Sequence, residues 1–594
     1  MHPTGKAQMT DSGAIGVIAV TERGRTAAGR LQAAWPDRVR TSTENRAGEQ
    51  LRSAFADCGA VVAFLAVGAT VRALAPVLGD KHTDPPVVCV DEALQHAVAV
   101  LGGHHGGNAL AVEVAGVLGC RPVVTTASDA ASAAPLDSYG ADLGLTVADT
   151  APLAPAGAAL LSGRPVRLEF DGDRAWPLPP LPPNASTATP RESAEALLRV
   201  SDRAAAPEAA PAVPTVVYRP PSLVVGVGSA RGAAAEEVGA LVDRTLAEAG
   251  LSARSVRALA TVDAKADEEG ILRAAAERGW PVRVLPASEL AGVDVPNPSE
   301  VVRAEVGTPS VAEAAALRAA GEDGASAALV ADKRKSENAT AAVARLRPRG
   351  RLALVGLGPG ARDLAAPRAL AELHRASVVV GLDQYLDQVR DLLRPGTRVV
   401  ASGLGQEEER ARTAVAEAQA GAAVALIGSG DAGVYAMASP ALDFAGADID
   451  VVGVPGITAA VAAAHRLGAP LGHDHAYISL SDLHTPWEAI ERRVRAAAEG
   501  DFTVCFYNPR SRRRDWQLPE ALRLLAEHRP PHTPVGYVRN AARDDEHAAV
   551  TTLAAMLDGE VEAVDMYTVV LVGSSASRTV AGRFVTPRGY TWRG

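Results

Sequence analysis

Cysteine is scarce in this chain of 594 residues, which contains four of them. Cys58, Cys89, Cys120 and Cys505 are far apart, and no two form a CxxC pair. This pattern argues against a zinc site, a disulfide framework and an iron–sulfur cluster, and we expect no metal site. Isolated cysteines are typical of proteins from a reducing cytosol.

The chain also lacks an excess of positive charge and any long apolar segment. Its formal net charge is -10, and no basic tract marks a phosphate-backbone partner, so nucleic acid is not favoured. The best candidate for a membrane span, 59–71, is too short and is followed by Arg72. Residues 1–13 lack the basic-then-apolar order of a signal peptide. We therefore expect a soluble, cytoplasmic protein without a membrane partner.

Aromatic residues make up only 4% of the chain, whereas apolar residues make up 47%. This balance favours α/β layers packed closely on small residues, and the length predicts three to five folding units. Short apolar runs at 16–20, 61–65, 87–90 and 122–126 alternate with helical patterns. Such alternation predicts parallel α/β units, so the expected fold class is α/β with several units.

Composition divides the rest of the chain. Residues 176–221 are rich in Pro, Ala and Ser, which predicts a linker, with a short helix around 192–200. A new α/β unit is expected over 222–346. After a short hinge at 347–350, a last α/β unit is expected over 350–594.

Glycine-rich loops follow apolar strands in this last unit. The first is Gly356-Leu-Gly-Pro-Gly360, where glycines allow a tight turn and close backbone approach to a ligand. The obvious alternative interpretation is a dinucleotide-binding loop. Asp383 lies near the distance in sequence at which such loops have an acidic residue that binds ribose. Pro359, however, lacks the backbone N–H that a phosphate cradle would use.

Two further loops carry polar side chains at strand ends. In Gly428-Ser-Gly-Asp-Ala-Gly-Val-Tyr435, Asp431 is expected to face the ligand crevice of an open sheet or to cap the following helix. It could accept hydrogen bonds from a ribose, an amine or ordered backbone. In Val454-Pro-Gly-Ile-Thr-Ala459, Thr458 and Ala459 leave room for an adenine or ribose, or form a plain turn.

A fourth stretch, Phe506-Tyr-Asn-Pro-Arg510, leads into a basic cluster in the sequence. Asn508 and Arg510 lie where a strand meets a loop, and Arg512, Arg513 and Arg514 follow. The cluster is either a solvated face or a set of Arg forks for the carboxylates of a macrocycle.

Together these loops resemble the tetrapyrrole methyltransferase family, and within it the precorrin-3B C(17)-methyltransferases. The resemblance covers about 350–590, and it rests on the stretches 429–435, 468–474, 478–483, 485–488, 507–511, 533–536, 538–540 and 585–590. It implies two α/β lobes, usually a homodimer, and S-adenosylmethionine as the methyl donor. The implied reaction methylates carbon 17 of the ring, which contracts as the carbon-20 unit is extruded.

The resemblance and the loops together predict the site. The expected cofactor-binding residues are Gly358, Pro359, Gly360, Ser429, Gly430, Asp431, Val434, Tyr435, Thr458, Ala459, Tyr507, Asn508 and Asn540, and Arg510 is expected to bind substrate. Methyl transfer from a sulfonium needs alignment more than a strong base, but ring contraction also moves protons. His473, Asp474 and Asp482 are the candidates for that role.

The N-terminal half carries its own motifs. His104 and His105 lie in a glycine turn at an expected helix N-terminus, where the dipole lowers the pKa of imidazole and favours anions. They could serve an acyl-group hydrolysis or hold a substrate carboxylate. In the middle unit, Lys333 and Lys335 could bind ring carboxylates, with Lys265 and Arg334, and Glu300 could act as a general base toward water.

As a set these stretches resemble cobalt-precorrin-5A hydrolase over about 16–346. The resemblance implies an N-terminal domain at 14–86, a central region at 87–175 and a C-terminal domain at 222–346. The implied reaction opens a lactone and releases the extruded fragment as acetaldehyde. One departure is Ser229, where the family commonly carries Cys, which puts a catalytic role at that position in doubt.

The expected protein is therefore a bifunctional enzyme of cobalamin biosynthesis with a tetrapyrrole intermediate as its partner. The first alternative is a monofunctional methyltransferase whose N-terminal half only binds or hands on the intermediate. The second is a nicotinamide dehydrogenase built on the first glycine loop. The sequence leaves open whether the substrate carries cobalt.

Overall fold

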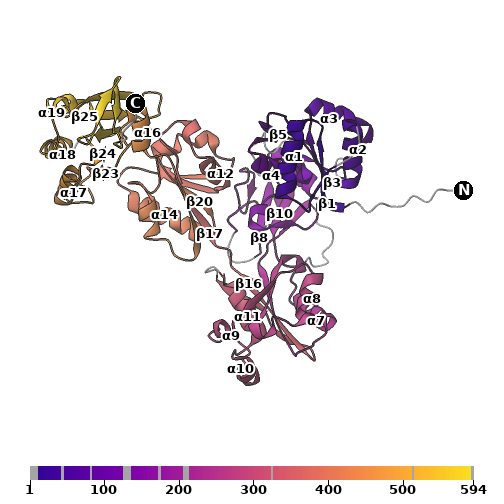
Figure 1. Cartoon of the computed structure of the whole chain (residues 1–594). Helices are drawn as coiled ribbons and strands as arrows, with labels where there is room; N and C mark the ends of the chain where they lie inside the picture. The colour runs from indigo at the N-terminus through magenta and orange to yellow at the C-terminus, as the bar shows by residue number, and fades with distance from the viewer. Residues whose placement is uncertain are drawn as a thin grey trace. The chain divides into compact units, whose positions relative to one another are not determined.

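The computed structural model describes residues 11–41, 46–80, 83–124, 135–171, 176–204, 213–322, 326–511 and 514–589. The chain forms two compact units, Met1–Ser138 and Tyr139–Gly594 (Figure 1). Both units are built of α-helices and β-strands, which confirms the α/β fold class. Among the described residues, no helix combines the length and apolar character needed to cross a membrane.

The first unit is one six-stranded sheet with the order β2-β1-β3-β4-β5-β6. Its strands are β1 Asp11–Ala19, β2 Val39–Thr41, β3 Cys58–Phe64, β4 Val87–Val90, β5 His96–Leu101 and β6 Arg121–Val123. Its helices are α1 Glu22–Ala34, α2 Ala47–Asp57, α3 Val67–Leu74 and α4 Asn108–Leu118. Side chains of α1 and α4 share one core, while α2 and α3 contribute to a second.

The expected boundary between 86 and 87 is wrong, because β3 and β4 pair within this sheet. All four residues of β4 are buried, as expected for an inner strand of a sheet covered on both faces.

The second unit begins with a five-stranded sheet of order β7-β11-β10-β8-β9. Its elements are β7 Thr146–Val147, α6 Leu153–Leu161, β8 Val166–Phe170, β9 Ala185–Ser186, β10 Ala196–Val200 and β11 Thr215–Arg219. The linker expected at 176–221 and the helix expected at 192–200 are therefore wrong over β10 and β11, which are inner strands of this sheet. Ala196, Leu197, Leu198 and Val200 are buried, and proline-rich sequence on either side concealed this short apolar run. Residues 172–175 and 205–212 lie outside the described residues.

A third sheet has the order β14-β13-β12-β16-β15. Its strands are β12 Leu223–Ser229, β13 Val256–Val262, β14 Val282–Leu285, β15 Ala327–Lys335 and β16 Ala339–Leu346. Its helices are α7 Ala235–Glu248, α8 Glu269–Glu277, α9 Ala287–Leu290, α10 Glu300–Val306 and α11 Val311–Ala320. Helix α11 packs so closely on β12 that a Cβ at Gly226 would lie 1.8 Å from the Ala312 carbonyl oxygen.

The fourth sheet, the centre of a region named the first lobe (350–458), has the order β19-β18-β20-β17-β21 with every pair parallel. Its strands are β17 Gly350–Gly356, β18 Val378–Leu382, β19 Arg398–Ser402, β20 Ala423–Gly428 and β21 Ile449–Val454. Its helices are α12 Pro367–Arg375, α13 Asp383–Leu386, α14 Glu407–Gln419 and α15 Ala438–Leu442.

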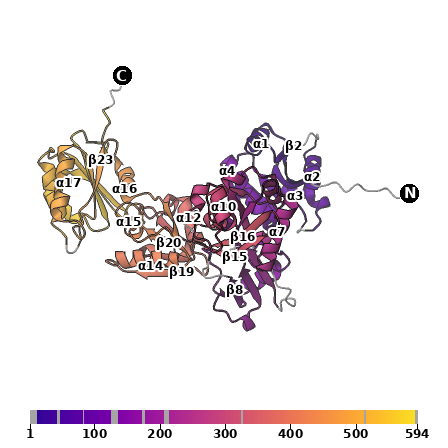
Figure 2. The ribbon, with the colours of Figure 1, turned by 90° about the horizontal axis from the view of Figure 1, so that it is seen from below.

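The second lobe (459–589) has a five-stranded sheet of order β23-β24-β27-β25-β26 and a small sheet of order β22-β29-β28. The strands are β22 Gly468–Ala469, β23 His475–Ser479, β24 Thr503–Tyr507, β25 Pro534–Arg539, β26 His547–Thr552, β27 Thr568–Val572, β28 Arg578–Val580 and β29 Arg583–Val585. The helices are α16 Ala459–Leu467, α17 Trp487–Glu499, α18 Gln517–Ala526 and α19 Leu553–Leu557. Helices α17 and α18 share one core with the large sheet and α16 shares another, so α16 and α17 flank it on opposite sides (Figure 2).

Candidate functional site

The strand order of the first lobe brings three glycine loops to one edge. Strand β17 lies between β20 and β21 and is parallel to both. Parallel strands end at the same edge, so the loops that follow β17, β20 and β21 are neighbours although they are far apart in the sequence. These three loops, 356–360, 428–435 and 454–459, are named the loop junction.

Backbone groups hold the loop junction together. The Gly358 N–H donates to the Gly430 carbonyl at 3.0 Å, and the Gly430 N–H donates back at 2.8 Å. A Cβ at Gly456 would lie 2.1 Å from the Gly430 carbonyl oxygen and 2.8 Å from backbone of Gly356. Glycine is therefore required where these peptides touch.

Asp431 joins two of the loops through its carboxylate. One oxygen accepts the Gly433 N–H at 2.8 Å and the other accepts the Gly456 N–H at 3.0 Å. The next helix, α15, begins only at Ala438, so the expected helix cap is absent. A ribose, an amine or ordered backbone is expected to donate to this carboxylate, and in the structure backbone N–H groups do so. Each oxygen keeps a further lone pair for a ligand.

The end of β24 in the second lobe reaches the loop junction. The Tyr507 hydroxyl lies 2.5 Å from Oγ1 of Thr458 and accepts the N–H of Ala460 at 3.0 Å. This contact satisfies one of the unpaired N–H groups at the start of α16. Burial raises the pKa of Tyr507 above its ordinary value, so the phenol is neutral at pH 7.

Three tyrosine rings cluster beside this contact. The rings of Tyr435 and Tyr507 are 5.2 Å apart, and those of Tyr477 and Tyr507 are 5.8 Å apart. The Tyr435 hydroxyl donates to the Tyr477 carbonyl at 2.7 Å. Tyr435 nevertheless keeps 53% of its surface exposed, so part of an aromatic side chain is available to a flat ligand.

The turns around the loop junction hold unusual backbone conformations. Tyr435, Asn508 and Asn540 have φ of 52°, 50° and 50°, values that cost about 1–3 kcal/mol when a non-glycine residue adopts them without compensation. Asn508 donates to Oγ of Ser479 at 3.1 Å, and Asn540 donates to Asp545 at 2.7 Å. Strained turns of this kind gather at ligand clamps.

The strand directions of the second lobe explain why these turns share one edge. Strand β23 is parallel to β24, and β27 is antiparallel to both β24 and β25. The carboxyl ends of β23, β24 and β25 therefore point the same way, and they present Ser479, Asn508 and Asn540 at one edge.

Arg543 is a site residue that the sequence analysis missed. Its Nε donates to the Pro359 carbonyl at 3.2 Å, and its Nη2 donates to Oγ of Ser429 at 3.4 Å. It thus connects the second lobe to two of the three loops. In the sequence it looks like an ordinary charge in a charged turn, and only its place just after Asn540 points to the site.

The loop geometry argues against a dinucleotide fold. In a dinucleotide-binding unit the glycine loop runs directly into a helix whose N-terminus faces the pyrophosphate. Here α12 begins only at Pro367, well after Gly360. The first glycine loop therefore lacks the anion site that a nicotinamide dinucleotide requires.

Two of the three candidate catalytic residues lie away from the loop junction. His473 and Asp474 directly precede β23, at the edge of the sheet opposite to Ser479. Nδ1 of His473 accepts the Asp474 N–H at 2.7 Å, and both side chains are exposed. Asp482 follows β23 and is on the same edge as Asn508, where it accepts from Nε2 of Gln517 at 2.9 Å. The structure therefore does not bring the first two residues to this junction.

The Arg510 side chain also contacts other residues of the second lobe. Its guanidinium pairs with Glu562 at 2.7 Å and donates to the Val561 carbonyl at 3.2 Å. Arg514 donates to the Asn508 carbonyl at 2.9 Å and to Oγ of Ser481 at 3.0 Å. Both arginines stabilise the turn, and the structure shows Arg510 paired with protein groups. Arg512 and Arg513 lie outside the described residues.

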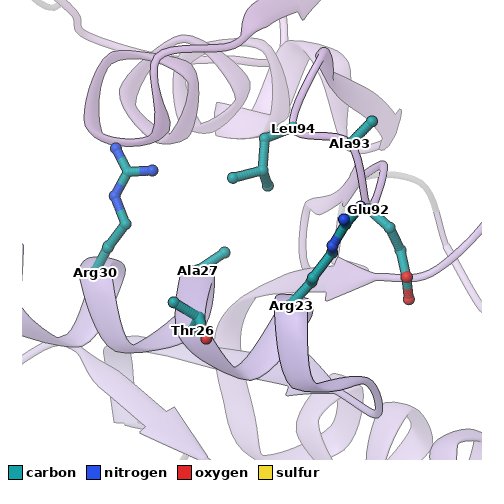
Figure 3. A pocket seen from close by; sticks show the side chains of 7 residues that line it. All are labelled: Arg23, Thr26, Ala27, Arg30, Glu92, Ala93 and Leu94. Carbon is teal, nitrogen blue, oxygen red and sulfur yellow. The ribbon is translucent and has the colours of Figure 1, made fainter.

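The first unit contains the turn with the two histidines. The backbone of His104 and His105 belongs to a π turn, Gly103–Gly107, that leads directly into α4, as expected for a helix N-terminus. Their side chains lie outside what the structure describes. A separate cavity of about 310 Å³ lies between α1 and the turn after β4, and its polar lining includes Arg23, Arg30 and Glu92 (Figure 3).

The candidates of the third sheet are scattered. The Glu300 side chain is 88% exposed and faces Arg303 at 4.0 Å, an environment that does not favour a general base. The Lys333 ammonium donates to the Asn297 carbonyl, and Lys335 is exposed. Oγ of Ser229 is buried and has no hydrogen-bond partner among the residues that the structure describes.

A buried carboxylate, missed by sequence reasoning, organises this region. Glu313 is fully buried near the start of α11 and accepts from Nδ2 of Asn297 at 2.8 Å and from the Lys333 N–H at 3.2 Å. These bonds satisfy the carboxylate within the fold, so it is a structural group.

Comparison with known families matches four regions of the chain. Residues 351–557 match the tetrapyrrole (corrin/porphyrin) methylases. Residues 49–129, 134–220 and 223–344 match the cobalamin synthesis G N-terminal, the cobalamin biosynthesis central region and the cobalamin synthesis G C-terminus. Both resemblances drawn from the sequence are thereby confirmed.

Individual relatives match the C-terminal part. A probable cobalt-factor III C(17)-methyltransferase of Salmonella typhimurium is 45% identical over 243 residues, which are 40% of this chain and 99% of that protein. A precorrin-3B C(17)-methyltransferase of a Sinorhizobium species is 42% identical over 237 residues, or 39% of this chain and 91% of that protein.

Two solved structures cover the same region. The crystal structure of the methyltransferase CobJ is 38% identical, and the match covers 40% of this chain and all of that one, with a TM-score of 0.38. A uroporphyrin-III C-methyltransferase from Thermus thermophilus, complexed with S-adenosyl homocysteine, is 28% identical, covering 38% of this chain and 97% of that one at a TM-score of 0.31.

Proposed function

The chain belongs, through its C-terminal part, to the tetrapyrrole (corrin/porphyrin) methylases, and on this premise we propose that residues 350–594 methylate carbon 17 of a tetrapyrrole with S-adenosylmethionine as donor. The observation that carries the proposal is the loop junction. Three glycine loops from adjacent parallel strands meet there, and Tyr507 and Arg543 join them to the second lobe.

The residues of the loop junction fit a neutral nucleoside that carries an amino acid. Pro359 and the late start of α12 leave no phosphate cradle, while glycine backbone, aromatic rings and hydroxyl groups suit adenine and ribose. We propose that Gly358, Pro359, Gly430, Thr458, Ala459, Tyr507 and Asn540 line this site together with Gly360, Ser429, Val434, Tyr435 and Asn508. S-adenosylmethionine supplies an electrophilic methyl group when bound.

The chain's own residues align the reacting groups and supply a carboxylate for proton movement. Asp431 holds two loops at fixed spacing, and a carbon nucleophile aligned with a methyl group gains most of its rate from such positioning. Asp482 is the carboxylate on the site edge and is our candidate for proton movement during ring contraction. His473 and Asp474 are not proposed for this step.

The substrate is proposed to be precorrin-3B or its cobalt-containing counterpart. The relatives named for these two substrates are 42% and 45% identical to the C-terminal part of this chain, so both forms are retained. Incubation with each form, followed by mass spectrometry of the product, distinguishes them by which one gains a methyl group.

For the N-terminal half we propose hydrolysis of the cobalt-precorrin-5A lactone with release of acetaldehyde. The three family matches over 49–344 support it. The alternative is a half that only binds or hands on the intermediate, and buried Ser229, with no thiol, favours it. Acetaldehyde formed from cobalt-precorrin-5A by the full chain would support hydrolysis, and its absence would support the alternative.

Binding of S-adenosylhomocysteine, measured by calorimetry on the full chain, tests the methyltransferase site. We expect micromolar binding by the natural protein and a loss of at least about tenfold in Asp431→Ala, because two N–H groups lose a charged acceptor. Asp443→Ala, an exposed carboxylate of the same lobe, is the matched control and is expected to bind normally. A folded natural protein that binds no donor analogue would overturn the proposal.

The assembly and the division of the chain are also proposed. We propose a homodimer formed through the methyltransferase part, in the cytoplasm, to be checked by sedimentation velocity and cell fractionation. We propose domain bounds of 222–346 and 350–594 for the last two regions, with the hydrolase-like N-terminal domain extended to 123 to include β6. Limited proteolysis should cut between these bounds.

A further inference from the structure

Arg543 occupies an unusual position for a surface-loop arginine. It lies in the turn between β25 and β26, and its side chain crosses to the first lobe, where it donates to Pro359 and Ser429. The contact is close, because a Cβ at Gly360 would lie 2.6 Å from Cγ of Arg543. Gly360 has φ of 147°, a conformation open to glycine and rarely adopted by other residues, and it leaves room for the arginine stem.

The turn itself directs Arg543 toward the loop junction. Ala542 has φ of 60°, and its N–H donates to the Glu546 carboxylate at 2.7 Å. The Arg543 N–H donates to the Asn540 carbonyl at 3.0 Å. A left-handed residue held by a charged acceptor costs conformational energy, and such turns persist where they aim a functional group.

Arg543 has no carboxylate partner within the described part of the chain. Its neighbours Asp545 and Glu546 are occupied, since Asp545 pairs with Arg539 at 3.2 Å and Glu546 pairs with Arg466 at 2.5 Å. Arg510, on the same edge, pairs with Glu562. A guanidinium has five N–H donors, and only two of those of Arg543 have partners in the structure.

We propose that Arg543 binds a carboxylate of a ligand at the loop junction. This inference rests on the proposed methyltransferase function. The positive charge is half-buried between Pro359 and Ser429, and both of its contacts are neutral oxygens. A forked guanidinium with free donors matches a carboxylate in shape and charge. Two ligands of this site carry such a group: the methyl donor has one on its amino acid, and the macrocycle has acetate and propionate side chains.

Two donor analogues separate these sources. S-adenosylhomocysteine carries the amino acid carboxylate, whereas 5′-methylthioadenosine has the same nucleoside and sulfur without it. If Arg543 binds the donor, Arg543→Gln should weaken S-adenosylhomocysteine by about tenfold or more, the usual effect of losing a charge-assisted hydrogen bond. Binding of 5′-methylthioadenosine should stay within about twofold of the natural protein, because neutral contacts are unchanged.

A macrocycle probe covers the second source. Uroporphyrin III carries acetate and propionate groups, and its binding can be followed by absorbance. If Arg543 binds the ring, Arg543→Gln should weaken uroporphyrin and leave both donor analogues unchanged. Arg543→Lys keeps the charge without the fork and should recover part of the lost affinity. Arg578→Gln, an exposed arginine of β28, is the matched control.

Two outcomes overturn the inference while the proposed function stands. In the first, a folded Arg543→Gln protein, checked by circular dichroism, binds all three probes as the natural protein does. In the second, it loses S-adenosylhomocysteine and 5′-methylthioadenosine equally, which would assign Arg543 to loop structure alone. If the natural protein binds no donor analogue, the proposed function fails instead.

Discussion

The methyltransferase-like and hydrolase-like parts of the chain differ in how they gather their candidate residues. In the first, side chains and peptides from loops of two sheets meet within hydrogen-bonding distance, as the contacts of Tyr507 and Arg543 demonstrate. In the second, Glu300 is exposed, Lys333 is bound to a backbone carbonyl and Ser229 is enclosed. A site already assembled within one chain predicts sharp mutational effects, whereas scattered candidates predict weak ones.

The largest effect expected from this contrast is that of Gly456→Ala. The new Cβ would lie 2.1 Å from the Gly430 carbonyl oxygen, and overpacking of this kind costs about 1–3 kcal/mol of unfolding free energy. We expect binding of S-adenosylhomocysteine to be lost while acetaldehyde release from cobalt-precorrin-5A continues. Gly453→Ala, at a position of β21 with open space around it, is the control. Equal loss of both activities would contradict the separation of the two parts.

A smaller effect is expected from Tyr507→Phe. The change removes the acceptor of the Ala460 N–H and the partner of Thr458, and an unsatisfied buried donor costs about 1–3 kcal/mol. Denaturant unfolding measured by fluorescence should show a lower midpoint, and donor binding should weaken. Tyr385→Phe in the first lobe is the matched variant. A midpoint equal to that of the natural protein would mean that water replaces the hydroxyl without cost.

The tyrosine cluster also gives a pH signature to the methyltransferase-like part. Burial, with Cys505 and Tyr507 as neighbours, raises the pKa of Tyr477 to about 12, compared with about 10 in an unfolded chain. Because the folded pKa is raised, the neutral phenol contributes stability below about pH 10, and this contribution is lost as the pH rises toward about 12.

Absorbance at 295 nm, taken as the difference between the natural protein and Tyr477→Phe, measures this titration. The difference should appear near pH 12 in the folded protein and near pH 10 in guanidinium. A folded-state midpoint near 10 would show that the ring is fully hydrated.

The smallest effect is expected from Glu300→Gln in the hydrolase-like part. The side chain is 88% exposed at the start of α10, and surface substitutions of this kind change stability by less than about 0.5 kcal/mol. Acetaldehyde release should stay within about twofold of the natural rate. A large loss would restore Glu300 as a general base and would break the contrast between the two parts.

Strand-end positions make the meeting of the glycine loops predictable from sequence. Asp431 and Thr458 follow apolar strands in the sequence, and parallel strands deliver their loops to one edge. Tyr507 and Asn540 are expected only from the family resemblance. His473 precedes β23, and a residue that precedes a strand lies at the edge opposite to the strand's end, which its local sequence does not reveal.

Other features depended on pairing that a sequence does not display. Strand β10 is five residues long between proline-rich stretches, and its inner place in a sheet comes from its partners β8 and β11. Arg543 resembles any solvated charge until Pro359 and Ser429, distant in the sequence, are found beside it. Both depend on contacts between residues far apart in the chain, which local patterns cannot reveal.

The exchange of hydrogen bonds between Gly358 and Gly430 has an evolutionary consequence. Contacts made by peptide groups impose few demands on side chains, apart from the glycines that allow the approach. The loop junction can therefore persist while the surrounding residues diverge. A lineage with this fold could change the turns of the second lobe, and with them its ligand selectivity, while the backbone contacts between the loops stay the same.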